Sequence, residues 1–175
     1  MISELLLREP TVAVQRTLET AIPCLMAGAP LTFVNALPIL VLRRRAEVTK
    51  RWRDEWPSFD VETRRVGASV VSKLPLVLGL PLALMAFRAD VDLGVRLVLA
   101  NGLLEALPIP DLTRVIEEGL EADQRELRLS AAELLVRTPA LAATFGKRSD
   151  ADPEVHAVLE RSRIARPEAT GPLGS

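Results

Sequence analysis

Aliphatic stretches that close at a proline recur along the middle of the chain. Three of them are Asp60–Pro75 (DVETRRVGASVVSKLP), Val91–Pro108 (VDLGVRLVLANGLLEALP) and Gln124–Pro139 (QRELRLSAAELLVRTP). The closing prolines lie 33 and then 31 residues apart, and Thr11–Pro23 is a fourth, more diverged copy. In each of the three quoted stretches a basic residue, Arg65, Arg96 or Arg128, precedes the small and aliphatic positions that end at the closing proline. A fixed period of this length indicates a repeat architecture built from one supersecondary unit.

Each copy predicts a pair of helices, because its apolar residues recur at helical spacing. One predicted helix, between Gln124 and Thr138, has an apolar face made of Leu127, Ala131, Leu134, Leu135 and Thr138. Another, between Asp111 and Ala122, has an apolar face made of Leu112, Val115, Ile116, Gly119 and Leu120. Asp111 is placed to cap the latter helix, and Asp152-Pro153-Glu154 is placed to begin a last one.

The closing prolines predict where the helices end, and one apolar stretch predicts which helix is most buried. Proline has no amide hydrogen and clashes with a preceding helical turn, so each closing proline can end one helix and begin the next. Val91–Leu107 is apolar on almost every side, which predicts a helix that is covered on most sides. We expect aliphatic side chains of neighbouring copies to bury one another.

The segment Leu127–Leu135 (LRLSAAELL) resembles the second helix of HEAT repeats, in which a basic residue is followed by small and aliphatic positions. The resemblance covers about Asp60 to Arg163. It implies an all-α fold, a short solenoid of stacked antiparallel helix pairs. HEAT units are often longer and no inter-repeat ladder of Asp and Arg is complete, so the subtype stays open. The same segment bears a fainter resemblance to the THADA family of large helical proteins, which partner a tRNA 2′-O-methyltransferase.

The domain prediction is a single helical-repeat domain over residues 1–164, with an irregular proline-rich N-terminal third. Residues 165–175 have no apolar period and are expected to form a flexible tail. The last five residues, GPLGS, match the remnant that expression vectors leave.

Composition narrows the class of protein. Hydrophobic residues make up 49% of the chain but aromatic residues only 3%, so the core is expected to consist of Leu, Val, Ala and Ile. The net charge of −1 gives no overall field for binding nucleic acid or anionic membranes. Cys24 and His156 are the only residues of their types, which excludes an internal disulfide and a metal site of several cysteines or histidines. With no Gly-x-Ser-x-Gly elbow or phosphate-binding loop, we expect a non-enzymatic protein without cofactor or metal.

A basic, tryptophan-containing segment is the candidate partner-binding site. It comprises Arg43, Arg44, Arg45, Lys50, Arg51, Trp52, Arg53 and Trp56. On a helix, Val48, Trp52 and Trp56 share one apolar face. Either the segment forms a basic groove for phosphates or an acidic peptide, with an arginine stacked on a tryptophan. Or, as we favour, the tryptophans cover the N-terminal end of the stack while the arginines are solvated.

An acidic stretch further along the chain contrasts with this segment. Its seven carboxylates are Glu105, Asp111, Glu117, Glu118, Glu121, Asp123 and Glu126. A basic and an acidic region on one molecule could dock a partner or a second copy of the chain head to tail.

Three functions follow from these patterns. The first is a cytoplasmic scaffold or adaptor that binds a protein partner through its helical-repeat surface. The second is nucleic-acid binding, alone or within an RNA-modifying complex, through residues 43–56. The third is a small membrane protein with spans near 20–42 and 66–87, since both stretches are long and almost uncharged. Prolines inside both stretches weigh against spanning helices.

Overall fold

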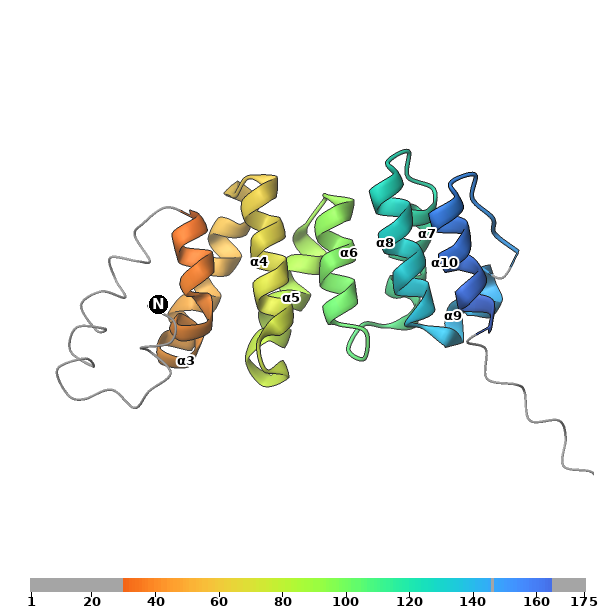
Figure 1. Cartoon of the computed structure of the whole chain (residues 1–175). Coiled ribbons are helices and arrows are strands. Elements are labelled where there is room, and N and C mark those ends of the chain that lie inside the picture. Colours follow the sequence, from red (N-terminus) through yellow and green to blue (C-terminus); the bar gives the residue numbers. More distant parts are fainter. Residues whose placement is uncertain (1–29, 146, 165–175) are drawn as a thin grey trace, which may run out of the picture. The chain divides into compact units, whose positions relative to one another are not determined.

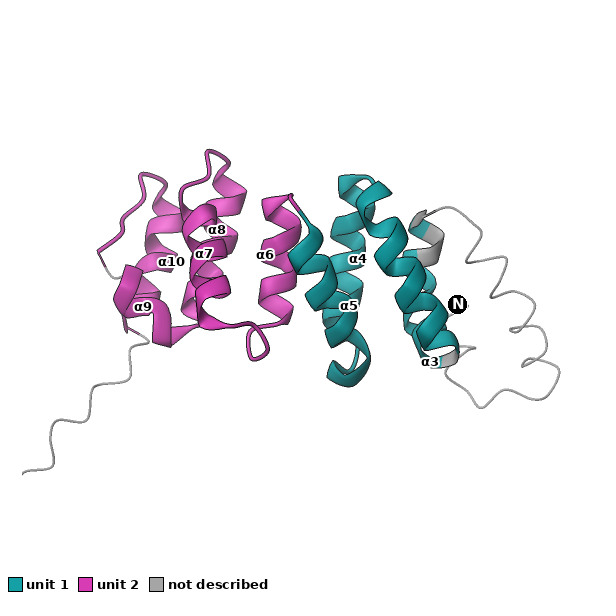
Figure 2. Ribbon diagram, turned by 180° about the vertical axis from the view of Figure 1, so that it is seen from behind, with its two compact units in different colours: residues 1–90 teal, residues 91–175 magenta. Residues whose placement is uncertain are grey.

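The computed structural model describes residues 30–145 and 147–164, and this part of the chain is all-helical, without a strand (Figure 1). The predicted all-α class is therefore confirmed. The chain divides into two compact units, residues 1–90 and 91–175 (Figure 2). The fourth copy at Thr11–Pro23, Cys24, residues 20–29 of the first predicted span and the tail 165–175 lie outside the described residues.

The helices of unit 1 are α3 (Pro30–Glu55), the short 3-10 helix η1 (Trp56–Ser58), α4 (Val61–Lys73) and α5 (Leu76–Ala89). Those of unit 2 are α6 (Leu93–Gly102), α7 (Ile109–Leu120), α8 (Arg125–Val136), α9 (Pro139–Phe145) and α10 (Pro153–Ile164). The closing prolines begin helices as predicted. Pro75 and Pro108 are the N-cap residues of α5 and α7, and Pro139 is the first residue of α9.

An aromatic cluster forms the core of unit 1. Trp52 and Trp56 are 0% and 1% exposed, with ring centroids 4.5 Å apart, and Phe59 packs edge-on against both. Gly67 of α4 lies against the two indoles, because a Cβ atom added there would come within 2.9 Å of each. The absence of a side chain at Gly67 therefore lets α4 pack directly on the tryptophans.

A buried carboxylate joins three parts of unit 1. Asp90, whose side chain is fully buried, accepts a hydrogen bond of 2.9 Å from the indole nitrogen of Trp56. The Nε atom of Arg64 lies 2.9 Å from the same carboxylate, and Arg64 also donates to the carbonyl of Phe59. Trp52 donates to the carbonyl of Leu82 over 3.1 Å. A buried charge is tolerated only with such partners, so Asp90 fixes η1 and the start of α4 to the end of α5.

Unit 2 is built around α8, which packs against α6, α7 and α10. The apolar face predicted for α7 is confirmed, since all five of its residues are buried. Ala131, Leu134 and Leu135 of the predicted α8 face are also buried. A Cβ atom at Gly119 would lie 2.6 Å from the Cβ of Ala131, so the glycine allows α7 and α8 to approach closely.

The N-termini of α4, α6 and α8 recur with a period of 32 residues. Their N-cap residues are Asp60, Asp92 and Gln124, and the two aspartates accept hydrogen bonds from the backbone amides of Thr63 and Val95. The fourth residues of these helices are Arg64, Arg96 and Arg128. The sequence prediction matched Arg65 with Arg96 and Arg128. In the structure Arg64, one residue earlier, occupies the equivalent position, because α4 begins at Val61.

Two further details of the sequence prediction are wrong. The helix expected over Val91–Leu107 is only Leu93–Gly102; Val91 is 91% exposed, and residues 103–108 form a turn and loop. Asp111 does not cap α7. The carbonyl of Pro108 accepts the first hydrogen bonds of that helix, from Asp111 and Leu112, so α7 starts two residues before Asp111.

No helix within residues 30–145 and 147–164 is both long enough and apolar enough to cross a membrane. The stretch 66–87, predicted as a possible span, is not one helix. It is divided between α4 and α5 by a break at Leu74 and Pro75. Proline lacks the amide that a continuing helix needs, which explains the break.

Candidate basic face on helix α3

Helix α3 consists of two segments joined at Arg44, whose backbone angles (φ −138°, ψ 44°) are not helical. The second segment contains most of the predicted binding residues. Val48 and Trp52 of this segment, with Trp56 just beyond it, are buried, as their common face predicted. Trp52 and Trp56 therefore cannot stack on a ligand, and the prediction that they belong to the binding surface is wrong. They are core residues because Gly67, Phe59 and the two indoles themselves cover the rings.

Two of the predicted arginines have carboxylate partners on the same helix. The Nε atom of Arg51 lies 2.7 Å from Glu55, and Arg44 lies 4.0 Å from Glu47. These pairs have the spacings of four and three residues at which side chains meet along a helix. The side chain of Arg43 lies outside what the structure describes.

The other three cations line a shallow depression. Arg45, Lys50 and Arg53 are exposed, and the small side chains of Ala46 and Thr49 lie between them. At about 100° per residue, these five positions occupy one side of the helix; Glu47 and Asp54, three residues before and four residues after Lys50, lie at its edge. Within the described residues no carboxylate forms an ion pair with any of the three cations. We call these five residues the basic face.

Arg45 also connects the basic face to α5, since its guanidinium donates to the carbonyl of Val77 over 3.2 Å. That bond uses one nitrogen of Arg45 and leaves donors for an anion. Arg and Lys supply only hydrogen-bond donors and positive charge, which suits carboxylates and phosphates. Among the described residues no group of His, Cys, Asp and Glu is arranged to hold a metal ion.

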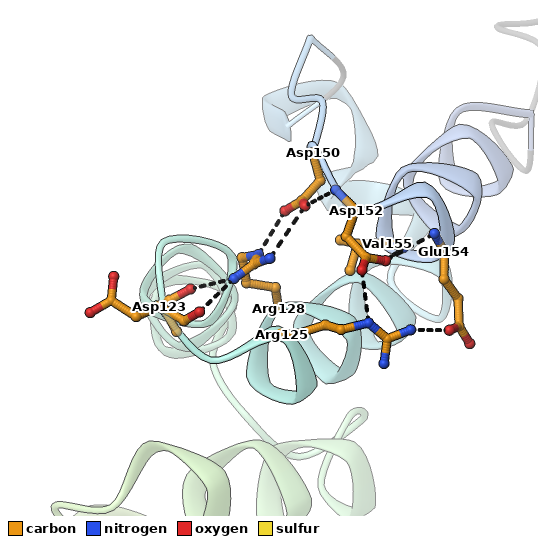
Figure 3. A network of polar contacts seen from close by, with 8 residues as sticks. Asp123, Arg125, Arg128, Asp150, Asp152, Glu154 and Val155 are labelled. Atoms are coloured by element: carbon orange, nitrogen blue, oxygen red, sulfur yellow. Dashed lines mark hydrogen bonds and ion pairs between the residues drawn. The ribbon is translucent and has the colours of Figure 1, made fainter.

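Besides the basic face, charged side chains also gather in unit 2, where they form a network of hydrogen bonds and ion pairs (Figure 3). Arg128 of α8 lies 2.8 Å from Asp150 and donates to the carbonyls of Ala122 and Asp123. Arg125 lies 2.8 Å from Asp152, which caps α10 by accepting the amides of Glu154 and Val155. These groups satisfy one another, so the network fastens the start of α10 to α8.

The network also perturbs its carboxyl groups. Burial pushes the pKa of Asp150 up, but the amide of Asp152 and the guanidinium of Arg128 outweigh it and hold the pKa below its usual range. The amide of Val155 and then Arg125 hold the pKa of Asp152 low. Both groups are thus stabilised in their charged forms.

The predicted acidic region has fewer carboxylates available for binding a partner than the sequence suggested. Glu118 pairs with Arg96 at 2.6 Å, and Arg148 lies 3.6 Å from Glu117 and 2.8 Å from Glu121. Three of its seven carboxylates therefore have an arginine partner inside unit 2. His156 is exposed on α10, with Nε2 3.7 Å from Glu160.

Sequence reasoning missed which arginines are already paired. The spacing of Arg44 to Glu47 and of Arg51 to Glu55 could have indicated it, since both spacings match a helical contact. It also missed Asp90. This carboxylate is buried although its neighbours Ala89 and Val91 are exposed, and no local sequence pattern indicates that.

Comparison with models of known protein families, with characterised proteins and with solved structures found no match to this chain.

Proposed function

We propose that this protein is a non-enzymatic scaffold of HEAT-like repeats that binds an acidic segment of a partner protein on the basic face of α3. The observation that carries the proposal is the group of three exposed cations, Arg45, Lys50 and Arg53, without carboxylate partners in the described chain. The chain has a net charge of −1, yet these three cations lie together while the neighbouring Arg44 and Arg51 are paired, which gives a local field suited to an anion.

The repeat part of the proposal rests on the period of 32 residues in the caps and arginines of α4, α6 and α8. Arg64 pairs with Asp90 and Arg128 with Asp150, and each carboxylate lies two residues before the cap of a later helix, Asp92 or Asp152. Such pairs would form the rungs of an Arg–Asp ladder along a short solenoid. The corresponding position before Gln124 is Ala122, and Arg96 pairs with Glu118 instead.

Protein is favoured over nucleic acid as the partner because the two tryptophans are buried. Single-stranded nucleic acids bind largely by stacking bases on aromatic side chains, and the basic face contains none. An acidic peptide needs only the cations and the small residues between them. Fluorescence anisotropy with RNA and with duplex DNA at low and high salt tests the alternative, and no binding at low salt excludes it.

The charge-reversal variant Arg45→Glu/Lys50→Glu/Arg53→Glu tests the proposal. We expect partner capture from cell extract to be lost, and the affinity for the purified partner to fall at least roughly tenfold, because charges across an interface control association. The control is Arg114→Glu/Lys147→Glu/Arg161→Glu, which makes the same change of charge at exposed positions of unit 2. Equal recovery of partners by both variants would show that the basic face is not the binding site.

A further inference from the structure

Three large aliphatic side chains are exposed at one end of unit 1. Leu42 is 66% exposed, Leu76 58% and Val77 74%. Leu42 precedes the break in α3 at Arg44, and the other two form the first turn of α5. This break and the turn between α4 and α5 lie at the same end of the unit (Figures 1 and 2), where Arg45 donates to the carbonyl of Val77. We call Leu42, Leu76 and Val77 the aliphatic tip.

The tip is not an extension of the core. Helix α5 buries Gly79, Leu82, Ala83, Ala86 and Phe87. At about 100° per residue, Val77 lies on the side of α5 opposite Gly79 and Ala86. Leu76 directly follows Pro75, at the end of the helix where no further turn covers it. Exposed aliphatic residues scattered singly need no explanation, but three at one end of a unit indicate a surface that something apolar covers.

The charges around the tip are positive. Lys73 ends α4 just before the turn, and Arg45 touches Val77. Residues 66–89 contain no Asp or Glu at all. Glu47, the acid closest in sequence to the break in α3, faces Arg44. Neither Lys73 nor Arg45 forms an ion pair with a carboxylate of the described residues. The tip is therefore apolar at its end and basic at its sides.

We infer that this end of unit 1 rests on the surface of an anionic lipid bilayer. Leu42, Leu76 and Val77 enter the boundary between head groups and acyl chains, and Lys73 and Arg45 contact lipid phosphates. Aliphatic residues with flanking cations are the combination that binds such interfaces, since burial and charge attraction act together. A protein segment on the basic face would need the cations but not the exposed aliphatic residues. The lipid contact is thus separate from the proposed function and shares only Arg45 with it.

Sedimentation of the full chain with lipid vesicles tests the inference. We expect binding to vesicles of phosphatidylcholine with roughly one phosphatidylserine in three lipids, and little binding to phosphatidylcholine alone. Leu76→Ser/Val77→Ser should lower the partition coefficient at least about tenfold, because it removes the inserted side chains. Lys73→Gln/Arg45→Gln should lower it about fivefold per cation. Both pairs are exposed or at helix ends, and circular dichroism verifies that the variants fold.

Matched controls separate the tip from the rest of the surface. Val91→Ser/Ile164→Ser removes two exposed aliphatic residues elsewhere, and Arg114→Gln/Arg161→Gln removes two exposed cations of unit 2. Both controls should bind vesicles like the unmodified chain. The inference is overturned if anionic vesicles do not sediment the protein at low salt, if phosphatidylcholine alone binds equally, or if Leu76→Ser/Val77→Ser binds like its control. Partner capture that persists in Leu76→Ser/Val77→Ser while vesicle binding is lost would show that the two surfaces act separately.

Discussion

Arginines of unit 2 such as Arg128 and Arg148 pair with carboxylates from other parts of the same unit, whereas Arg45, Lys50 and Arg53 of unit 1 face solvent and pair with no carboxylate between residues 30 and 90. The cores of the two units differ as well. Unit 1 buries two tryptophans around one carboxylate, and unit 2 buries aliphatic residues and places its charged network at the edge. In unit 2 ion pairs thus join the helices near the surface, whereas in unit 1 the aromatic core and the buried pair of Asp90 with Arg64 join them.

The largest effect is expected from Asp90→Ala in unit 1. The substitution leaves Arg64 and the indole nitrogen of Trp56 without their buried acceptor, and breaking a buried pair in this way costs about 3–5 kcal/mol. Urea unfolding followed by tryptophan fluorescence measures it, since both tryptophans of the chain lie in unit 1. Asp54→Ala, at an exposed position of α3, is the control and should change the free energy of unfolding by less than about 0.5 kcal/mol. Overlapping curves for the two variants would contradict the role of Asp90.

A smaller effect is expected from adding one methyl group in each unit. Gly67→Ala places a Cβ atom against both indoles, and Gly119→Ala places one against Ala131. Overpacking costs about 1–3 kcal/mol, which exceeds the gain of about 1 kcal/mol in helix propensity. Fluorescence detects the loss in unit 1 and far-ultraviolet circular dichroism the loss in unit 2.

Two further variants sharpen this comparison. Ala131→Gly should partly rescue Gly119→Ala, because it removes the atom that the new methyl group meets. Gly102→Ala, at the exposed end of α6, should be neutral. If Gly67→Ala or Gly119→Ala raised the stability, the close packing of helices at these glycines would be refuted.

The smallest effect is expected from pH, acting on the network of unit 2. The pKa values of Asp150 and Asp152 are lower in the folded protein than their usual values. Their charged forms therefore stabilise the fold at pH above the unfolded value, and this contribution is lost as the pH falls through the folded value. We expect α10 to lose protection against hydrogen exchange in mild acid, and Asp150→Asn/Asp152→Asn to be less protected already at neutral pH and to show a flatter dependence on pH. A variant with the same pH dependence as the unmodified chain would exclude this role of the network.

Local features allowed much of the helical framework to be predicted. Periodicity and capping signals depend on residues within one or two helical turns of each other. Such signals predicted the apolar face of α7, most of that of α8, and the start of α10 at Asp152 and Pro153. They also predicted the helices begun by Pro75, Pro108 and Pro139. The prediction failed at Val91–Leu107, where the apolar pattern was followed past Asn101-Gly102, a dipeptide typical of turns and helix ends, at which α6 ends.

The sequence by itself determined an all-helical chain with a recurring aliphatic pattern, because helix formation depends on neighbours three or four residues away. Only the tertiary structure decided that Trp52 and Trp56 are core residues and that Asp90 is the buried partner of Trp56. It also decided that Arg45, Lys50 and Arg53 form no ion pair with a carboxylate of the described residues. Those outcomes depend on contacts such as Trp56 with Asp90 and Arg128 with Asp150, which join residues 34 and 22 positions apart. The packing of whole helices sets such distances, and no local pattern encodes them.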